Sequence, residues 1–186
     1  MQTLSRPIIV MAVVLSIAAA TFGAVAQEIP TAQVAVLDYQ KILRDSSSAV
    51  DIKAQVERQR QIYQDQITKQ EQELRDADQE LARQRTILAP EAFAQKRREF
   101  EERVAEVQRE VQSRKRELDQ AYDYGIQQVQ QALVGIITEL AEERGFNLIL
   151  SRQQIVYADK SLNISEEVLV RLNERLPKVT VPLAQE

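Results

Sequence analysis

Residues 67–100 read ITKQEQELRDADQELARQRTILAPEAFAQKRREF, and this stretch decides the fold. Apolar residues recur every seven positions before the proline and again after it, with Gln, Glu, Arg and Lys between them. Such a heptad pattern is typical of helices that pack along a narrow apolar seam. Pro90 suits the first turn of a new helix, where its missing N–H is not needed, so we expect the chain to reverse at 88–91.

The heptads extend in both directions from this turn. Before it, an uninterrupted helical pattern without Gly or Pro runs over 49–88, with one seam position held by Ile67, Leu74, Leu81 and Leu88. The complementary position is partly polar, because it holds Gln70, Ala77 and Gln84.

The second helix is expected from about Glu91 to Glu143, and Phe93 and Phe100 begin its heptads. A four-residue shift of register, or stutter, brings Tyr122 into the seam. Heptad spacing places both Phe side chains between the helices, although a grip on other chains near the turn is an alternative. The two helices have similar lengths, so we interpret 49–144 as an antiparallel coiled-coil hairpin.

Gly125 lies beside the stutter and admits two interpretations. It could be a hinge that lets the hairpin splay, or a place where the helices approach closely. Close packing is the favoured alternative.

The segments on either side of the hairpin change to a strand-like pattern. Strands are expected at Val34–Asp38, at 146–151 and at 155–158, and Ser165 is expected to cap a last amphipathic helix that ends by 176. The fold class is therefore mainly α with a small β body (α+β), in which the hairpin projects from a β-rich oligomerisation body. That body is formed by 27–48 and 145–176, and a flexible tail is expected over 177–186.

A small body with free strand edges predicts self-association. It offers little core, and the sequence has no Cys for disulfides. Open edges then need partners, most simply other copies of the chain. The residues expected on the associating strands are Val34, Val36, Leu148, Leu150 and Val156.

Residues 1–26 have the pattern of a cleaved export signal. Arg6 precedes the apolar run Ile8–Ala20, and Ala24-Val25-Ala26 matches a small-x-small cleavage site. The apolar run is shorter than the roughly 20 residues of a membrane-spanning helix. The sequence therefore predicts a soluble protein exported to a bacterial periplasm.

Composition argues against an enzyme. The chain has no Cys and no His, which excludes thiol nucleophiles, Ser-His-Asp triads and the usual zinc or haem ligands. We expect no cofactor and no metal site. Beyond residue 26, 28 acidic residues outnumber 23 basic ones, a net charge of −5 that argues against nucleic acid as a partner.

Charge is segregated along the hairpin. Residues 81–116, around the turn, carry ten basic and six acidic residues, a net of +4. By contrast, 49–80 carries eight acidic and five basic residues, and 117–144 carries six and one. The basic residues singled out as contacts for another protein chain or for a membrane are Arg83, Arg85, Lys96, Arg97, Arg98 and Arg103. The alternative is an ordinary solvated surface with i,i+4 ion pairs.

This order of segments resembles the Skp/OmpH family of periplasmic chaperones. The resemblance is carried by VAVLD at 34–38, by the long charged hairpin, and by FNLIL at 146–150 followed by IVYAD at 155–159. It covers essentially all of 27–176.

The resemblance implies a homotrimer whose hairpins surround a cavity. It implies an ATP-independent holdase that binds unfolded outer-membrane β-barrel proteins and prevents their aggregation before membrane insertion. We call residues 81–116, around the turn, the tip of the hairpin. Its positive charge leads us to expect transient contact with anionic membrane lipid. The alternative function is a structural coiled-coil tether or spacer of the cell envelope.

Overall fold

The computed structural model describes residues 30–183, and the predicted export signal lies outside them. The chain divides into two units, Met1–Thr31 and Ala32–Glu186, and every helix and strand described below lies in the second. In chain order these are β1 (Val34–Leu37), α1 (Tyr39–Asp45), α2 (Ser47–Gln84), α3 (Pro90–Arg144), β2 (Leu148–Ser151), the 3-10 turns η1 (Arg152–Gln154) and η2 (Lys160–Leu162), and α4 (Ser165–Arg175).

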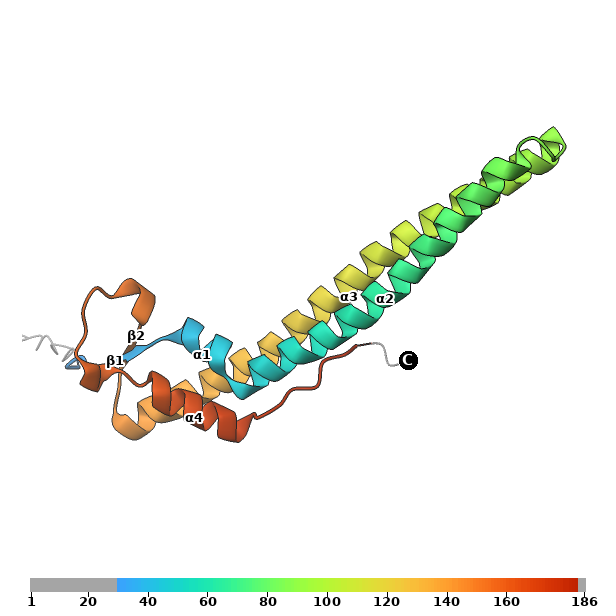
Figure 1. The fold of residues 1–186 in the computed structure, drawn as a ribbon. Coiled ribbons are helices and arrows are strands. Elements are labelled where there is room, and N and C mark those ends of the chain that lie inside the picture. Colours follow the sequence, from blue (N-terminus) through green and yellow to red (C-terminus); the bar gives the residue numbers. More distant parts are fainter. Residues whose placement is uncertain (1–29, 184–186) are drawn as a thin grey trace, which may run out of the picture. The chain divides into compact units, whose positions relative to one another are not determined.

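The long helices α2 and α3 form the predicted hairpin. Figure 1 shows that they alone make up its distal half, whereas α1, α4 and both strands gather at its root. The helices contain 38 and 55 residues, so at about 1.5 Å per residue they are roughly 57 and 80 Å long. The predicted fold class, mainly helical with a small β body, is confirmed.

Local signals in the sequence set the ends of these helices. The Ser46 hydroxyl accepts a hydrogen bond from the backbone N–H of Ala49 and caps α2. Pro90 opens α3, and Gly145 ends it in the left-handed conformation, with φ of 73°, which favours glycine. The turn begins earlier than expected, because α2 ends at Gln84 and its carbonyl accepts the N–H groups of residues 87 and 88.

The two strands pair in parallel, although one precedes the hairpin in the sequence and the other follows it. Val34 lies opposite Leu148, and Leu37 lies opposite Ser151. Val36 also bridges Asn163, so the segment before α4 borders the other edge of β1.

The predicted third strand at 155–158 is wrong. Instead, η1 follows β2 directly, and Val156 is fully exposed at 106% while Tyr157 is 83% exposed. Gln153 donates a hydrogen bond to Asp38 Oδ1 at 3.1 Å, at the end of β1. The chain therefore turns across the end of the sheet instead of returning along β2 as a hairpin.

The core lies at the hairpin root. Its large, fully buried hydrophobic side chains come from four helices and one strand: Val36, Ile42, Ile52, Val129, Leu133, Ile136, Leu140, Val168 and Leu172. Arg171 and Arg175 fasten α4 to α3 through two hydrogen bonds each, to Glu143 and Glu139. Ser165 is the first residue of α4, not its cap, and its hydroxyl accepts from the Asp38 N–H at 2.8 Å.

Two further expectations need correction at the root. Tyr122 is 43% exposed, because the small residues Ala121 and Gly125 take the seam positions there. In the predicted flexible tail, Val179 and Val181 are buried against the root, so this part of the tail is packed.

Candidate functional site

The distal half of the hairpin is an arm with little interior. Its seam residues Ile67, Leu74 and Leu81 are only half-buried, as are Phe93 and Phe100 on the opposite helix. Most of its surface consists of long Gln, Glu, Arg and Lys side chains, whose alkyl stems can cover apolar groups. Such a surface suits many weak contacts along an extended partner.

The six predicted basic residues surround the turn, and all of them are exposed. Three reach a carboxylate oxygen within ion-pair distance, namely Arg83 with Glu80 (3.7 Å), Arg97 with Glu101 (3.0 Å) and Arg103 with Glu73 (3.9 Å). More than half of each partner's side chain is exposed, so these pairs hold the cations weakly. Within residues 30–183, Arg85, Lys96 and Arg98 have no such pair. The end of the hairpin around the turn thus carries exposed cations with weak ion pairs or none.

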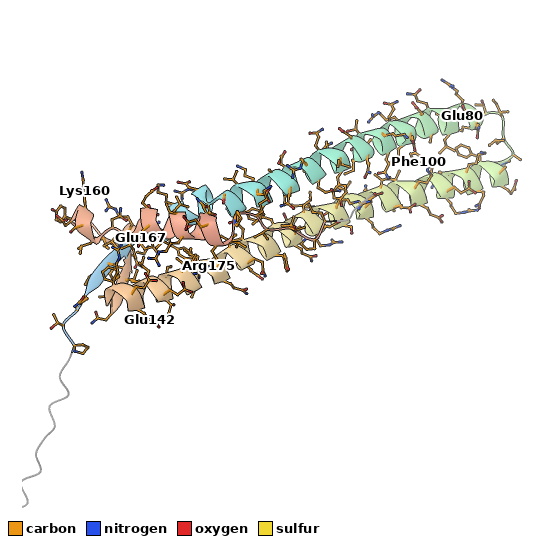
Figure 2. All side chains as sticks on the ribbon, turned by 90° about the horizontal axis from the view of Figure 1, so that it is seen from below. Glu80, Phe100, Glu142, Lys160, Glu167 and Arg175 are labelled. Carbon is orange, nitrogen blue, oxygen red and sulfur yellow. The ribbon has the colours of Figure 1, made fainter. Side chains whose placement is uncertain are left out.

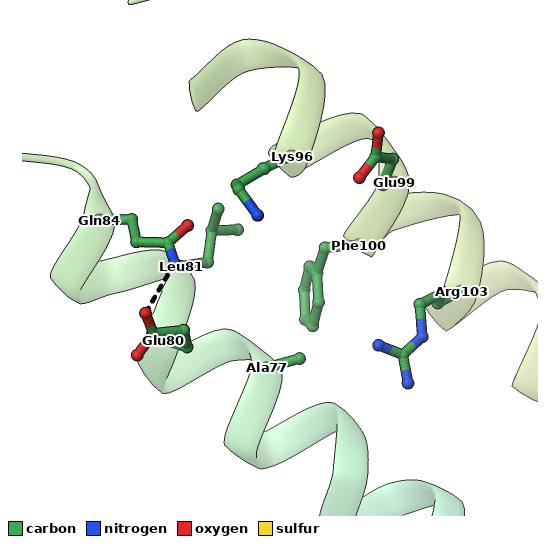
Figure 3. A pocket seen from close by; sticks show the side chains of 8 residues that line it. All are labelled: Ala77, Glu80, Leu81, Gln84, Lys96, Glu99, Phe100 and Arg103. Carbon is green, nitrogen blue, oxygen red and sulfur yellow. Dashed lines mark hydrogen bonds between the residues drawn. The ribbon is translucent and has the colours of Figure 1, made fainter. Parts of the chain in front are cut away.

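A shallow cleft of about 190 Å³ lies between the helices near the tip. Figure 3 shows the Phe100 ring pointing from α3 toward Ala77 and Leu81 of α2, with Lys96 and Arg103 to either side. Figure 2 places Phe100 and Glu80 near the turn, far from Arg175 at the root. Phe100 therefore packs between the helices, as its heptad position predicted.

A polar cluster joins α2 to α3 midway along the hairpin. Buried Tyr63 donates a hydrogen bond to Glu117 Oε1 at 2.8 Å, and the Arg114 guanidinium carbon lies 4.4 Å from its ring centroid. Burial, together with the neighbouring carboxylate, raises the pKa of Tyr63. Gln70 Nε2 donates to Glu110 Oε2 at 2.8 Å in the next layer. These pairs set which residues of the two helices face each other, and heptad counting does not reveal them.

A wide groove of about 1100 Å³ lies at the root between α1 and the hairpin. Apolar and aromatic side chains line much of it, including Tyr39, Leu43, Val50, Val56, Tyr122 and Ile126. Val50 and Tyr122 are exposed. The groove is open, large and mixed in polarity, which suits a flexible chain better than a small molecule.

The predicted associating residues lie in different environments. Val36 is buried within the chain and Val34 is half-buried, whereas Leu148 and Leu150 are exposed along β2. Val156 is exposed in the loop that follows η1. The β body therefore carries an apolar face that nothing in Ala32–Leu183 covers.

The described residues offer no metal site. Between residues 30 and 183, no three acidic side chains come together in a way that could hold a metal ion. Among the helices of that range, none combines the length and apolar character needed to cross a membrane.

A family model described as outer membrane protein (OmpH-like) matches residues 33–172, three quarters of the sequence. The chain belongs to this OmpH-like family. A solved structure from Caulobacter crescentus CB15, described as that of a candidate outer membrane chaperone (OmpH-like), is similar to it with a TM-score of 0.75. The likeness covers 82% of this chain and 90% of that chain at 18% identity, and therefore establishes the fold. No curated protein matches the sequence.

Every site residue predicted for the OmpH-like chain falls inside the matched segment. The six cations lie on the end of α2, in the turn and on the beginning of α3, and their role as contacts stays a prediction. Gly125 lies in the seam at the root, and a Cβ there would be 2.9 Å from Ile52 Cδ1 and from Val181 Cγ1. Close packing thus explains this glycine, and its role as a hinge stays a prediction.

Sequence reasoning missed a contact between α2 and the tail of the OmpH-like chain. Gln55 on α2 bonds to the backbone of the tail at Val179 and Val181. Apolar and polar residues alternate in the tail, and this pattern could have indicated a packed extended segment. The residue that binds the tail, Gln55, lies more than 120 residues away in the sequence, so the pattern does not identify it.

Proposed function

We propose that this chain is an ATP-independent periplasmic holdase, which binds unfolded outer-membrane β-barrel proteins and prevents their aggregation before membrane insertion. The observation that carries the proposal is the match to the OmpH-like family over residues 33–172, the segment that contains the whole hairpin. The similar Caulobacter protein is itself described as a candidate outer membrane chaperone, and this supports the same proposal here.

The surface of the arm supports holding without a driven cycle. Its seam is narrow and its long side chains are exposed, so a bound chain makes many contacts, each of them weak. Weak contacts let a client leave when membrane insertion offers a more stable state. The root groove adds an open, partly apolar surface on which side chains of an unfolded protein can rest.

The β body supports assembly into a homotrimer. Leu148 and Leu150 are exposed on a sheet of two strands, and such a sheet is marginal in water without further cover. Exposed Val156 and Tyr157 enlarge this apolar face. Copies of the chain can cover it by packing their bodies together, which would leave the hairpins to project around a shared cavity.

The basic tip supports transient contact with anionic membrane lipid. Three of its cations have no ion pair within the described residues, and the other three have weak, exposed pairs. A cleaved signal at residues 1–26 would deliver the chain to the compartment where such membrane surfaces and clients occur.

Aggregation of an unfolded β-barrel protein tests the proposal. A urea-denatured outer-membrane β-barrel protein is diluted with residues 27–186, and light scattering is followed. We expect suppression at a near-stoichiometric ratio of trimer to client. Shortening both helices by the same number of heptads should weaken it, and so should Arg97→Glu with Arg98→Glu.

Charge reversal of two exposed cations on the β body, Arg152→Glu with Lys160→Glu, is the matched control and should have little effect. If both hairpin variants suppress aggregation like the unaltered chain, the hairpin is not the client surface. If the unaltered chain does not suppress aggregation, the envelope tether becomes the better account.

A further inference from the structure

The segment after α4 runs as a strap along the hairpin root. We define the strap as residues 178–183, and Figure 1 shows it leaving α4 and following α2. Val179 and Val181 are 7% and 5% exposed, whereas Lys178, Thr180 and Pro182 between and beside them are exposed. Alternate burial is the pattern of an extended chain with one face against a surface.

One side chain binds the backbone of the strap. Gln55 Nε2 donates to the carbonyl oxygen of Val179 at 2.7 Å, and the N–H of Val181 donates to Gln55 Oε1 at 3.3 Å. In an extended chain these two groups point to the same side, where a neighbouring strand would bind them. Asp51 Oδ2 accepts a second hydrogen bond from Gln55 Nε2 at 2.8 Å, so the carboxamide is held in this orientation.

The floor beneath the strap is shaped by a missing side chain. A Cβ on Gly125 would lie 2.9 Å from both Ile52 Cγ1 and Val181 Cγ1, too close for an ordinary contact. Glycine at this position therefore leaves room for Val181 beside Ile52. Ile52 and Gly125 on the apolar side and the Gln55 carboxamide at the edge thus form the surface that the strap covers. We call this surface the strap groove, which is distinct from the root groove.

Such a groove recognises a pattern and no particular sequence. Main-chain hydrogen bonds hold an extended peptide, and contacts with alternate side chains select which peptides fit. Strands of outer-membrane β-barrels alternate apolar and polar residues with the same period of two. The Val-Thr-Val of the strap has that pattern as well.

We propose that this groove is a binding site for extended segments with apolar side chains at alternate positions, and that the strap occupies it as an internal competitor. The inference rests on the proposed function, because it identifies such segments with those of unfolded β-barrel clients. The family match ends at residue 172, before the strap, so the competitor is a feature of this chain beyond the matched segment.

The sequence of the strap is consistent with its displacement from the groove by a client segment. Pro177 and Pro182 flank its central residues and restrict the free chain, which favours binding within the molecule. Proline also lacks an N–H, so the strap cannot extend its pairing as a longer strand would. A client segment with a longer alternating run makes more contacts and can take its place.

Two labelled peptides test the site by fluorescence anisotropy. One is LPKVTVPL, the sequence of residues 176–183, and the other is the alternating peptide KTVTVTVTK. The protein is residues 27–186 with its strap released by Val179→Ser and Val181→Ser. Lys178→Ser with Thr180→Ser is the matched control, because it alters exposed positions of the same segment.

We expect the released protein to bind both peptides about tenfold or more tightly than the unaltered and control proteins, since an internal competitor acts at millimolar effective concentration. Adding Gln55→Ala to the released protein should remove the gain. A chain that ends at Leu176 provides a second release if the serine variant has lower helicity by circular dichroism.

The outcomes separate the two proposals. If the released protein binds LPKVTVPL but not KTVTVTVTK, the groove serves only its own strap and the inference is overturned. It is also overturned if neither peptide binds while the unaltered chain still suppresses aggregation, and then the holdase proposal stands. If both peptides bind but no version suppresses aggregation, the groove is supported and the holdase proposal fails.

Discussion

Replacing Gly125 with alanine should destabilise the fold, although alanine is the better helix former. In an open helical position this substitution stabilises by about 0.5–1 kcal/mol. Here the added Cβ would lie 2.9 Å from Ile52 and Val181, and overpacking of this kind costs about 1–3 kcal/mol. We therefore expect a net loss of about 1 kcal/mol in the free energy of unfolding.

The contact with the strap can be isolated by a second substitution. Val181→Ala alone should cost about 1.5 kcal/mol, because it removes two buried methyl groups. It also removes one of the three atoms that would lie 2.9 Å from the new Cβ, so the two substitutions together should cost less than their sum by about 0.5–1 kcal/mol.

Urea denaturation followed by circular dichroism, at one fixed protein concentration, measures these free energies. Gly135→Ala in the same helix is the matched control, because a Cβ there would have only the Arg175 guanidinium near it, at 4.0 Å. The control should be stabilised by about 0.5–1 kcal/mol. If Gly125→Ala stabilises as much as the control, or if the two substitutions add without coupling, the close approach at the root is refuted.

Three further predictions concern the core, the root and the middle of the hairpin. Leu133→Ala should lower the free energy of unfolding by about 2–5 kcal/mol because Leu133 is fully buried, whereas exposed Val134→Ala should change it by less than about 0.5 kcal/mol. The hydrogen bond from Arg175 lowers the pKa of Glu139 below its ordinary 4.5, so the pair stabilises the fold above that pH and loses its effect as pH falls through the lower folded value. The midpoint temperature of thermal unfolding should therefore fall less steeply between pH 6 and pH 3 for Glu139→Gln than for the unaltered chain. An equal slope for the two proteins would contradict this. Tyr63→Phe should cost about 1 kcal/mol in urea denaturation through its lost hydrogen bond, and a neutral result would remove the mid-hairpin cluster from the account.

The hairpin could be predicted from sequence because its signals are local. Heptads give the seam, Ser46 and Pro90 mark where helices begin, and Gly145 marks where α3 ends. Each signal depends on residues a few positions apart. The charge of the tip is equally local, since it follows from residues on both sides of one turn.

The stutter was only partly predictable. Counting apolar residues favours Tyr122 in the seam, yet the structure puts Ala121 and Gly125 there and leaves Tyr122 exposed. Small residues fill a seam where helices approach closely, and a Cβ at Gly125 would lie 2.9 Å from both Ile52 and Val181 of the strap. A sequence pattern along one helix does not contain this information.

The third strand and the tail could not be predicted, because both depend on contacts between distant residues. Residues 155–158 have a strand-like sequence, but Gln153 bonds to Asp38 and the chain turns away from β2. From the sequence alone, Val179 and Val181 belong to a flexible tail. In the structure, Gln55 forms hydrogen bonds with their backbone groups.

Native mass spectrometry of residues 27–186 tests the central claim most directly. Three samples are measured: the chain alone, the chain with one equivalent of an unfolded outer-membrane β-barrel protein diluted from urea, and the chain with the folded form of that β-barrel protein. A holdase of the proposed kind gives a trimer alone, a trimer with one client when the barrel is unfolded, and no complex when it is folded. A monomer or dimer, or equal binding of folded and unfolded barrel, would contradict the account.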